Sequence, residues 1–208
     1  MEKYTVTEES LTAVADAIRG RAGTEDALVF PDGFVSAVEG IPDTLYQSIT
    51  NTLKSYESDK VVGTLRASAF GNNQKIESVR FPNVTQVGSY CFQNCYALNS
   101  VYFPSLTIID AAGFYGCSSL PIIDGNIKSI GDQAFRSCGK LTTLIMRKTD
   151  SVATLGGTNV FYGTPIASGT GYIYVPRALV DNYKSATNWS NHANQIRAIE
   201  DYPEITGG

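Results

Sequence analysis

Charged residues, histidine and long apolar runs are all scarce in this chain. Only 17% of its 208 residues are charged and a single histidine is present, whereas soluble domains carry about 25% charged residues. Acidic residues outnumber basic ones by 20 to 16, without the basic stripe that marks duplex nucleic-acid binders. No apolar run reaches the roughly 18 residues of a membrane-spanning helix. We therefore expect neither nucleic acid nor membrane as a partner.

The four cysteines do not form a disulfide or zinc framework in the sequence. They stand at 91, 95, 117 and 138. Cys91 and Cys95 would make half of a zinc site, but no second pair follows and His192 is distant. Residues Met1–Glu9 are acidic and polar where a signal peptide needs a basic end and an apolar stretch. We expect no export signal, no metal, no cofactor and four free thiols.

Catalytic motifs are also missing. Nucleophilic catalysis needs a Ser or Cys beside an oriented base, and His192 lies in a polar stretch with no nucleophile in a recognisable context. No phosphate-binding loop, dinucleotide fingerprint or Gly-x-Ser-x-Gly occurs, and nothing selects a carboxylate pair for glycoside hydrolysis. We therefore expect that the chain is not an enzyme. A tail-associated polysaccharide depolymerase stays open only through analogy with enzymes built on β-solenoids.

An internal repeat organises the middle of the chain. Its anchor is a phenylalanine at positions 70, 92, 114, 135 and 161. Aliphatic residues recur five positions before and six and nine positions after the first four anchors. Each copy is too short to bury its apolar face alone, so the copies must stack and share a core. We predict two buried columns, one of phenylalanines and one of cysteines: Phe92, Phe114 and Phe135; Cys95, Cys117 and Cys138.

Each copy is predicted to contain two short extended segments joined by a tight turn. Glu77–Phe81 and Asn99–Phe103 alternate polar and apolar residues, which is typical of half-buried strands. A proline follows each and ends it. Val84–Gly88 predicts the second strand, and Tyr90–Cys95 is too short for a helix and predicts a single turn.

The repeated motif resembles the BspA-type leucine-rich repeats. It runs Val/Ile-Gly, Ala-Phe, Cys, Leu, then Val followed by Pro, over residues 65 to about 165. The resemblance implies a mainly β, right-handed leucine-rich-repeat solenoid of about five coils with short turns, which binds partners and performs no chemistry. The sequence departs from the motif at Gly125, at Ala111–Gly113 and in Lys148–Gly157, where we expect local loops.

The solenoid is assigned to residues 42–170 and a C-terminal cap to 171–208, because the open ends of a stack need covering. Residues 42–64 predict an irregular first coil, with strands at 45–50 and 61–65 around a polar turn at 56–60. In the cap, a strand at 171–175 precedes a helix at 177–184. Pro176 suits the helix start, and Trp189 and Ile196 supply the bulk that closes the last coil.

Residues 1–41 predict a small helical module. Four apolar residues have helical spacing after a capping Thr7: Leu11, Val14, Ala15 and Ile18. Pro31 opens a second short helix. One interpretation is a two-helix cap on the solenoid. The other is a resemblance of Ser10–Arg19 and Ala27–Phe34 to the opening module of tail-associated structural proteins from phages of Gram-positive bacteria, which implies attachment to other virion proteins.

The outward face of the strands is the predicted binding surface, as in other repeat proteins. The candidate binding residues stand ten positions after the first four anchors: Arg80, Tyr102, Asp124 and Ile145. A second outward column stands eight positions after the same anchors: Ser78, Ser100, Ile122 and Thr143. This mixed, mostly uncharged set suits a carbohydrate or a protein better than a polyanion. A solvated face without function is the alternative.

Two functions follow from the resemblances. The first is a non-enzymatic phage virion structural protein of the tail, baseplate or fibre. Residues 1–41 would attach it to other virion proteins, and the solenoid would bind a host-surface glycan or protein, or another virion protein. The protein could also form homo-oligomers. The second is a BspA-like bacterial surface adhesin. An adhesin must be secreted, so the expected lack of an export signal favours assembly in the host cytoplasm.

Overall fold

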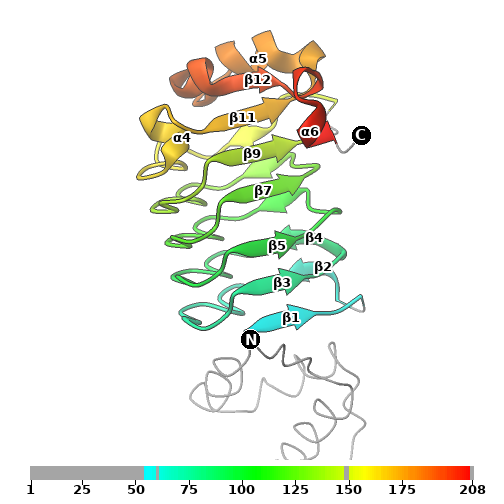
Figure 1. Ribbon diagram of the computed structural model, residues 1–208, viewed down its shortest axis with the longest axis vertical. Helices are drawn as coiled ribbons and strands as arrows, with labels where there is room; N and C mark the ends of the chain where they lie inside the picture. Colours follow the sequence, from blue (N-terminus) through cyan, green and yellow to red (C-terminus); the bar gives the residue numbers. More distant parts are fainter. Residues whose placement is uncertain (1–53, 60, 148–149, 207–208) are drawn as a thin grey trace, which may run out of the picture. The chain divides into compact units, whose positions relative to one another are not determined.

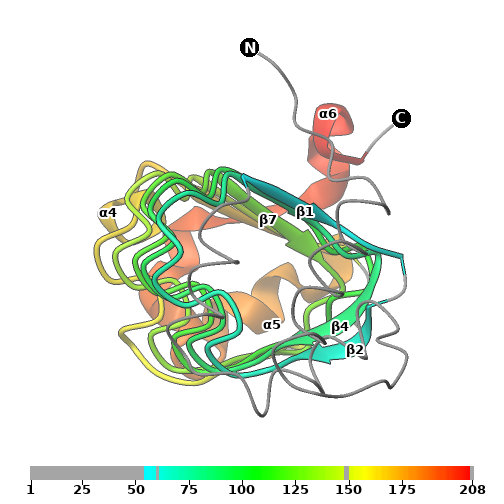
Figure 2. The ribbon, with the colours of Figure 1, turned by 90° about the horizontal axis from the view of Figure 1, so that it is seen from below.

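The computed structural model describes residues 54–59, 61–147 and 150–206, which belong to one compact unit, Thr50–Gly208. The predictions for the module at 1–41 and for a strand at 45–50 lie outside these residues. Within this unit the chain winds through stacked coils, each with a strand on two opposite sides (Figures 1 and 2). The mainly β, repeat-built fold predicted from the sequence is confirmed.

One side of the coils carries the strands that we call the front sheet. Parallel pairing divides it into a three-stranded and a four-stranded group: β1 (Ser55–Glu57), β3 (Ser78–Arg80) and β5 (Ser100–Tyr102); β7 (Ile122–Gly125), β9 (Thr143–Met146), β11 (Tyr172–Val175) and β12 (Ile196–Ala198). Proline explains the division. Asn99 and Thr142 each donate a backbone N–H to the preceding coil, but Pro121 stands at the equivalent position between them and has no N–H to donate.

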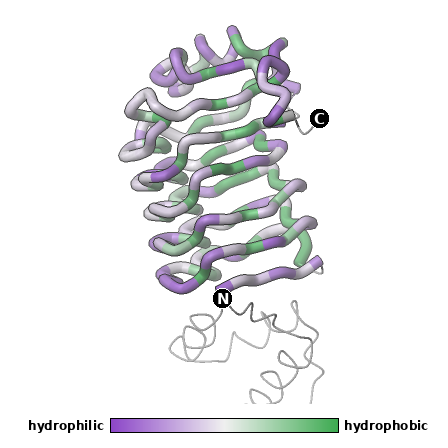
Figure 3. Tube along the Cα trace, viewed as in Figure 1, coloured by the Kyte–Doolittle hydropathy of each residue, from purple (hydrophilic) through white to green (hydrophobic). Residues whose placement is uncertain are grey.

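The opposite side carries one continuous parallel sheet, the back sheet. Its five strands pair in the order β10-β8-β6-β4-β2: β2 (Val62–Leu65), β4 (Asn83–Val87), β6 (Ile108–Ile109), β8 (Ser129–Ile130) and β10 (Thr154–Leu155). Each strand keeps its last aliphatic residue inside, as Val87 and Ile109 illustrate. Hydrophobic and hydrophilic stretches therefore alternate around every coil (Figure 3).

The turns between the two sheets are built on left-handed residues that recur in phase. Two positions before the anchor, φ is +58° at Tyr90 and +55° at Ala112; two positions after it, φ is +57° at Asn94 and +73° at Gly116. Alternate N–H groups then donate to the next coil, as Phe92 does to the Gly113 carbonyl. This hydrogen bonding continues the ladder through the turn, and it satisfies polar backbone groups that burial would otherwise leave unpaired.

Phenylalanine rings stack along the whole core, as predicted. Successive centroids are 5.0 to 5.8 Å apart from Phe70 to Phe161, with interplanar angles of 4° to 15°. Tyr56 meets the first ring edge-on at 5.1 Å, and Trp189 lies 6.2 Å beyond the last. The aromatic column thus fixes the stacking register of the coils.

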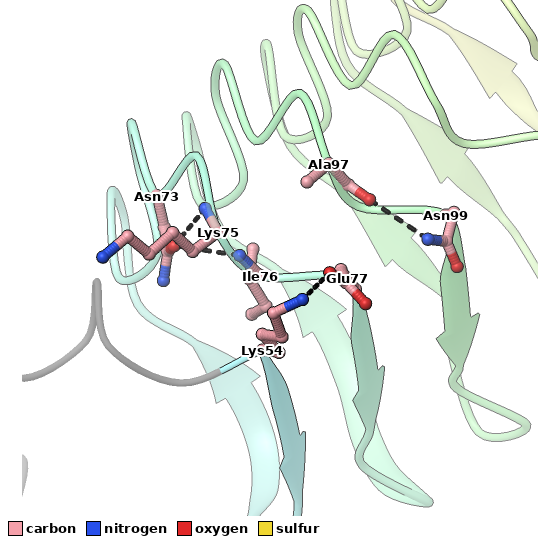
Figure 4. A network of polar contacts seen from close by, with 7 residues as sticks. All are labelled: Lys54, Asn73, Lys75, Ile76, Glu77, Ala97 and Asn99. Carbon is pink, nitrogen blue, oxygen red and sulfur yellow. Dashed lines mark hydrogen bonds and ion pairs between the residues drawn. The ribbon is translucent and has the colours of Figure 1, made fainter. Parts of the chain in front are cut away.

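The cysteines form the second predicted column. Each thiol donates a hydrogen bond of 3.0 Å to the carbonyl of the preceding coil's anchor: Cys95 to Phe70, Cys117 to Phe92 and Cys138 to Phe114. A cysteine therefore fills a small space and also satisfies a buried acceptor. In the first copy Asn73 takes this position, and its Oδ1 accepts from the N–H groups of Lys75 and Ile76 (Figure 4).

The C-terminal residues close the last coil with short helices and one strand. After the four-residue helix α4 (Pro165–Ser168) and β11 come η1 (Arg177–Leu179), α5 (Val180–Ser185), η2 (Trp189–Gln195), β12, η3 (Ile199–Asp201) and α6 (Pro203–Thr206). Trp189 Nε1 donates to the Ala153 carbonyl at 2.7 Å, and the Tyr183 hydroxyl accepts from the Ala153 N–H at 2.9 Å. Pro176 is the N-cap, not the first helical residue. No helix among the described residues is long and apolar enough to cross a membrane.

Two predicted loops and one predicted turn are wrong. Gly125 stays in β7, opposite Met146, where a larger side chain would press on the Leu106 carbonyl at 3.1 Å. Ala111–Gly113 follows the same turn as the other copies, because Ala112 adopts the left-handed conformation that Tyr90 has one coil earlier. At 56–60, Tyr56 lies in β1 with its ring on Phe70, so this residue is part of the core.

Candidate binding surface

The outward side chains of the front sheet fall into two columns. In the first, Glu57 is opposite Arg80, which is opposite Tyr102. In the second, Ser55, Ser78 and Ser100 lie opposite one another in the same strands. Parallel pairing in register places equivalent residues side by side at the spacing of neighbouring strands, about 4.8 Å. We call β1, β3 and β5 with these six outward side chains the open face.

Arg80 is the centre of the open face. Its Nη1 lies 3.1 Å from a carboxylate oxygen of Glu57 and 3.1 Å from one of Asp59. Its guanidinium also lies over the Tyr102 ring, 4.9 Å from the centroid. Partners on both sides orient the arginine, and the two carboxylates neutralise it. The Tyr102 side chain remains 49% exposed beside it.

A shallow depression of about 310 Å³ lies on this face, open to solvent. It is lined by outward side chains of all three strands and by the backbone between them: Ser55, Tyr56, Glu57, Ser78, Val79, Arg80, Ser100 and Tyr102. Lys54 and Glu77 form an ion pair of 2.7 Å at the start of β1 and β3, and Asn99 donates to the Ala97 carbonyl at the start of β5 (Figure 4). Both contacts are exposed and lie at the start of the strands.

The fourth candidate residue, Ile145, is not available for binding. It points outward, but only 3% of it is exposed, because the C-terminal segment covers it with Tyr174, Ile199 and neighbouring apolar side chains. The Tyr174 and Tyr202 rings meet edge-on at 4.9 Å. Figure 2 shows α6 outside the coils, beside the front sheet. The burial of Ile145 could not be predicted from the repeat, because a segment that folds back onto the sheet has no counterpart in it.

Comparison with protein families identifies the repeat. A model described as the BspA type leucine rich repeat region matches residues 39–168 in six copies. The chain belongs to this family. The matched region starts at residue 39, well before residue 65, where the repeated motif described above begins. No curated protein matches the chain.

Two solved structures resemble the chain at low identity. A leucine rich repeat protein of T. pallidum is 22% identical, with a TM-score of 0.50, over 59% of this chain. A leucine rich cell surface protein of Faecalibacterium prausnitzii A2-165 is also 22% identical over 59% of this chain, with a TM-score of 0.42. The chain spans 59% and 38% of the lengths of these two proteins. The first likeness supports the BspA-type fold.

Asp124, the third candidate, lies in an ion pair beyond the open face. Arg147 Nε donates to both carboxylate oxygens, at 2.8 and 3.0 Å, and its Nη2 lies 2.7 Å from one of them. The hydrogen bonds with Asp124 raise the pKa of Arg147. Ile122, in the second column of the same strand, is 39% exposed. Of the four candidates the structure brings Arg80 and Tyr102 together, places Asp124 in a separate pair and buries Ile145.

The four cysteines and His192 are buried in this BspA-type solenoid. Desolvation raises the pKa of Cys95 and Cys138 to about 12, and it raises those of Cys91 and Cys117 as well. Burial lowers the pKa of His192, whose ring packs edge-on against Phe161 at 5.1 Å. Among the described residues, no cluster of three or more His, Cys, Asp or Glu side chains has the geometry of a metal site.

Proposed function

We propose that this BspA-type chain is a non-enzymatic recognition protein whose right-handed solenoid presents the open face to a partner. The observation that carries the proposal is the alignment of Arg80 and Tyr102 beside the serine column, on strands that pair in register. Repeat proteins use such extended surfaces for recognition. The four thiols and His192 are buried. A catalytic nucleophile or base must reach its substrate, so we assign these side chains a structural role.

The second part of the proposal concerns where the protein acts. We propose a virion structural protein of the tail, baseplate or fibre of a phage of Gram-positive bacteria, in which residues 1–41 bind other virion proteins and the solenoid contacts the host surface. The similarity of Ser10–Arg19 and Ala27–Phe34 to tail-associated modules supports this assignment. A bacterial surface adhesin would use the same open face, and the location of the protein, in particles or on cells, distinguishes the two.

Binding to intact Gram-positive cells tests the recognition role. The labelled full chain should bind cells, and the double variant Arg80→Ala/Tyr102→Ala should lose at least tenfold in apparent affinity. Tyr162→Ala is the matched control, because Tyr162 is 59% exposed and lies under Arg136 at 4.8 Å, but in a turn. Equal binding by the double variant and the wild type would refute the open face as the recognition surface.

Deletion of residues 1–41 tests the setting separately. The shortened chain should keep the circular-dichroism spectrum of a strand-rich protein and fail to enter phage particles. If it enters particles normally, the solenoid is the docking surface and the attachment role of residues 1–41 is wrong.

A further inference from the structure

We propose that the open face binds a neutral, β-1,4-linked glycan chain that lies along the solenoid axis, with one sugar unit on each of β1, β3 and β5. The inference rests on the proposed function, since it uses the same surface, and it adds the ligand class and its direction. The spacing, the charge and the aromatic side chain of the open face support this ligand.

Spacing is the first argument. Ser55, Ser78 and Ser100 offer one hydroxyl per coil, in register. Successive coils are about 4.8 Å apart by strand spacing, and the anchor rings of these coils stack at 5.0 and 5.2 Å. An extended β-1,4-linked pyranose chain advances by nearly this interval per sugar, and successive sugars are turned over. Each sugar can therefore lie beside one serine hydroxyl, which both donates and accepts and so suits either orientation of the sugar. An α-1,4-linked chain curls away from a flat surface and loses this match.

Charge is the second argument. Among the described residues that line the depression, Arg80 is the one with a basic side chain, and Glu57 and Asp59 both pair with it. A polyanion would have to compete with two carboxylates for that guanidinium, so the charges of the open face disfavour an anionic ligand and are compatible with a neutral one. The hydroxyl groups of a sugar can still bond to the free edges of the oriented carboxylates and guanidinium, which is how polar recognition sites fix a neutral ligand.

Tyr102 is the third argument. A sugar presents a flat face of C–H groups, and the electron-rich face of an aromatic ring attracts their slightly positive hydrogens. Arg80 covers part of the Tyr102 ring and fixes its orientation, and about half of the side chain stays exposed. The depression of about 310 Å³ is at the lower end of the roughly 300–1,000 Å³ typical of small-molecule sites, which suits a short stretch of a longer polymer.

The end of the site beyond β5 follows from the same structure. Past β5 the ladder is interrupted at Pro121, Asp124 is paired with Arg147, and the C-terminal segment covers Ile145. The glycan therefore contacts the three coils of the open face, and affinity should rise with oligomer length only until these coils are occupied.

Titration calorimetry on the full chain tests the proposal with three hexasaccharides: β-1,4-linked N-acetylglucosamine, cellohexaose and maltohexaose. We expect binding of at least one β-1,4-linked hexamer, at least tenfold tighter than the α-1,4-linked maltohexaose, and a plateau of affinity as the oligomer lengthens from two to six sugars. Tyr102→Ala should lose at least tenfold in affinity and Ser78→Ala several-fold. Tyr162→Ala should bind as the wild type does, and thermal melts should confirm that each variant is folded.

The outcomes separate this proposal from the one on which it rests. If no β-1,4-linked hexamer binds better than maltohexaose, or if Tyr102→Ala binds as well as the wild type, the glycan assignment is overturned. If in that case the chain still binds intact cells through Arg80 and Tyr102, the recognition role stands with a protein as the ligand. If cell binding is also insensitive to both residues, both proposals fail.

Discussion

Phe114 is the middle ring of the phenylalanine column. It is fully buried between Phe92 at 5.2 Å and Phe135 at 5.8 Å. Phe114→Ala removes two ring stacks, each worth about 0.5–1.5 kcal/mol beyond area burial, and leaves a cavity. The whole loss should reach about 3–5 kcal/mol, the range for truncating a core aromatic residue. At about 2–4 °C per kcal/mol for a chain of this size, the melting temperature should fall by about 6–20 °C.

Urea denaturation with two probes measures this loss. Far-ultraviolet circular dichroism follows the strands, and the fluorescence of Trp189, the single tryptophan, follows the C-terminal cap at the end of the ring column. Tyr162→Ala is the control for removing an aromatic residue from the surface and should stay within about 0.5 kcal/mol of the wild type. A loss for Phe114→Ala no larger than that of the control would refute the stacking register.

The remaining predictions concern titration. Burial raises the pKa values of Cys95 and Cys138 from 9.0 to about 12, so above pH 9 the folded state holds thiol protons that the unfolded state releases. The contribution of these thiols to stability should be constant below about pH 9 and fall as the pH rises toward 12. Cys95→Ala should flatten this alkaline decline. Thiol reagents should count four free cysteines in the denatured protein and few in the native one; a disulfide after purification under reducing conditions would contradict this. Burial lowers the pKa of His192 from its ordinary value of 6.5, so its contribution to stability should be fully present above pH 6.5 and be lost as the pH falls through the folded-state pKa. His192→Gln should therefore lose less stability than the wild type as the pH falls below 6.5. An unchanged profile would show that the imidazole has the same pKa in the folded and unfolded states.

The equivalent positions of the repeat were predictable because large side chains recur at them. Phe92, Phe114 and Phe135 recur at nearly fixed intervals, and a residue that is buried in one coil is buried in the next when coils stack in register. The same logic placed Cys95 and its equivalents in one column. It also assigned Arg80 and Tyr102 to the outward face, where the structure has them.

The errors arose where a single coil departs from the average. Gly125 fits a strand although it offers no side chain to the core, because its neighbours Leu106 and Ile127 approach closely enough to fill the space. Ile145 follows the outward pattern of its column, yet tertiary contacts with Ile199 bury it. No periodicity in the sequence encodes a contact that is made once, by a segment folding back onto the sheet.

Hydroxyl-radical footprinting of the full chain tests the central claim, that the open face is the recognition surface. Tyrosine reacts readily, and the chain offers internal references that are about equally exposed: Tyr90, Tyr96 and Tyr162 in turns, against Tyr102 on the open face. With saturating soluble cell-wall fragments from a Gram-positive host, we predict that the oxidation rate of Tyr102 falls several-fold while those of the three references do not change. Protection of the turn tyrosines with Tyr102 still reactive would contradict the account.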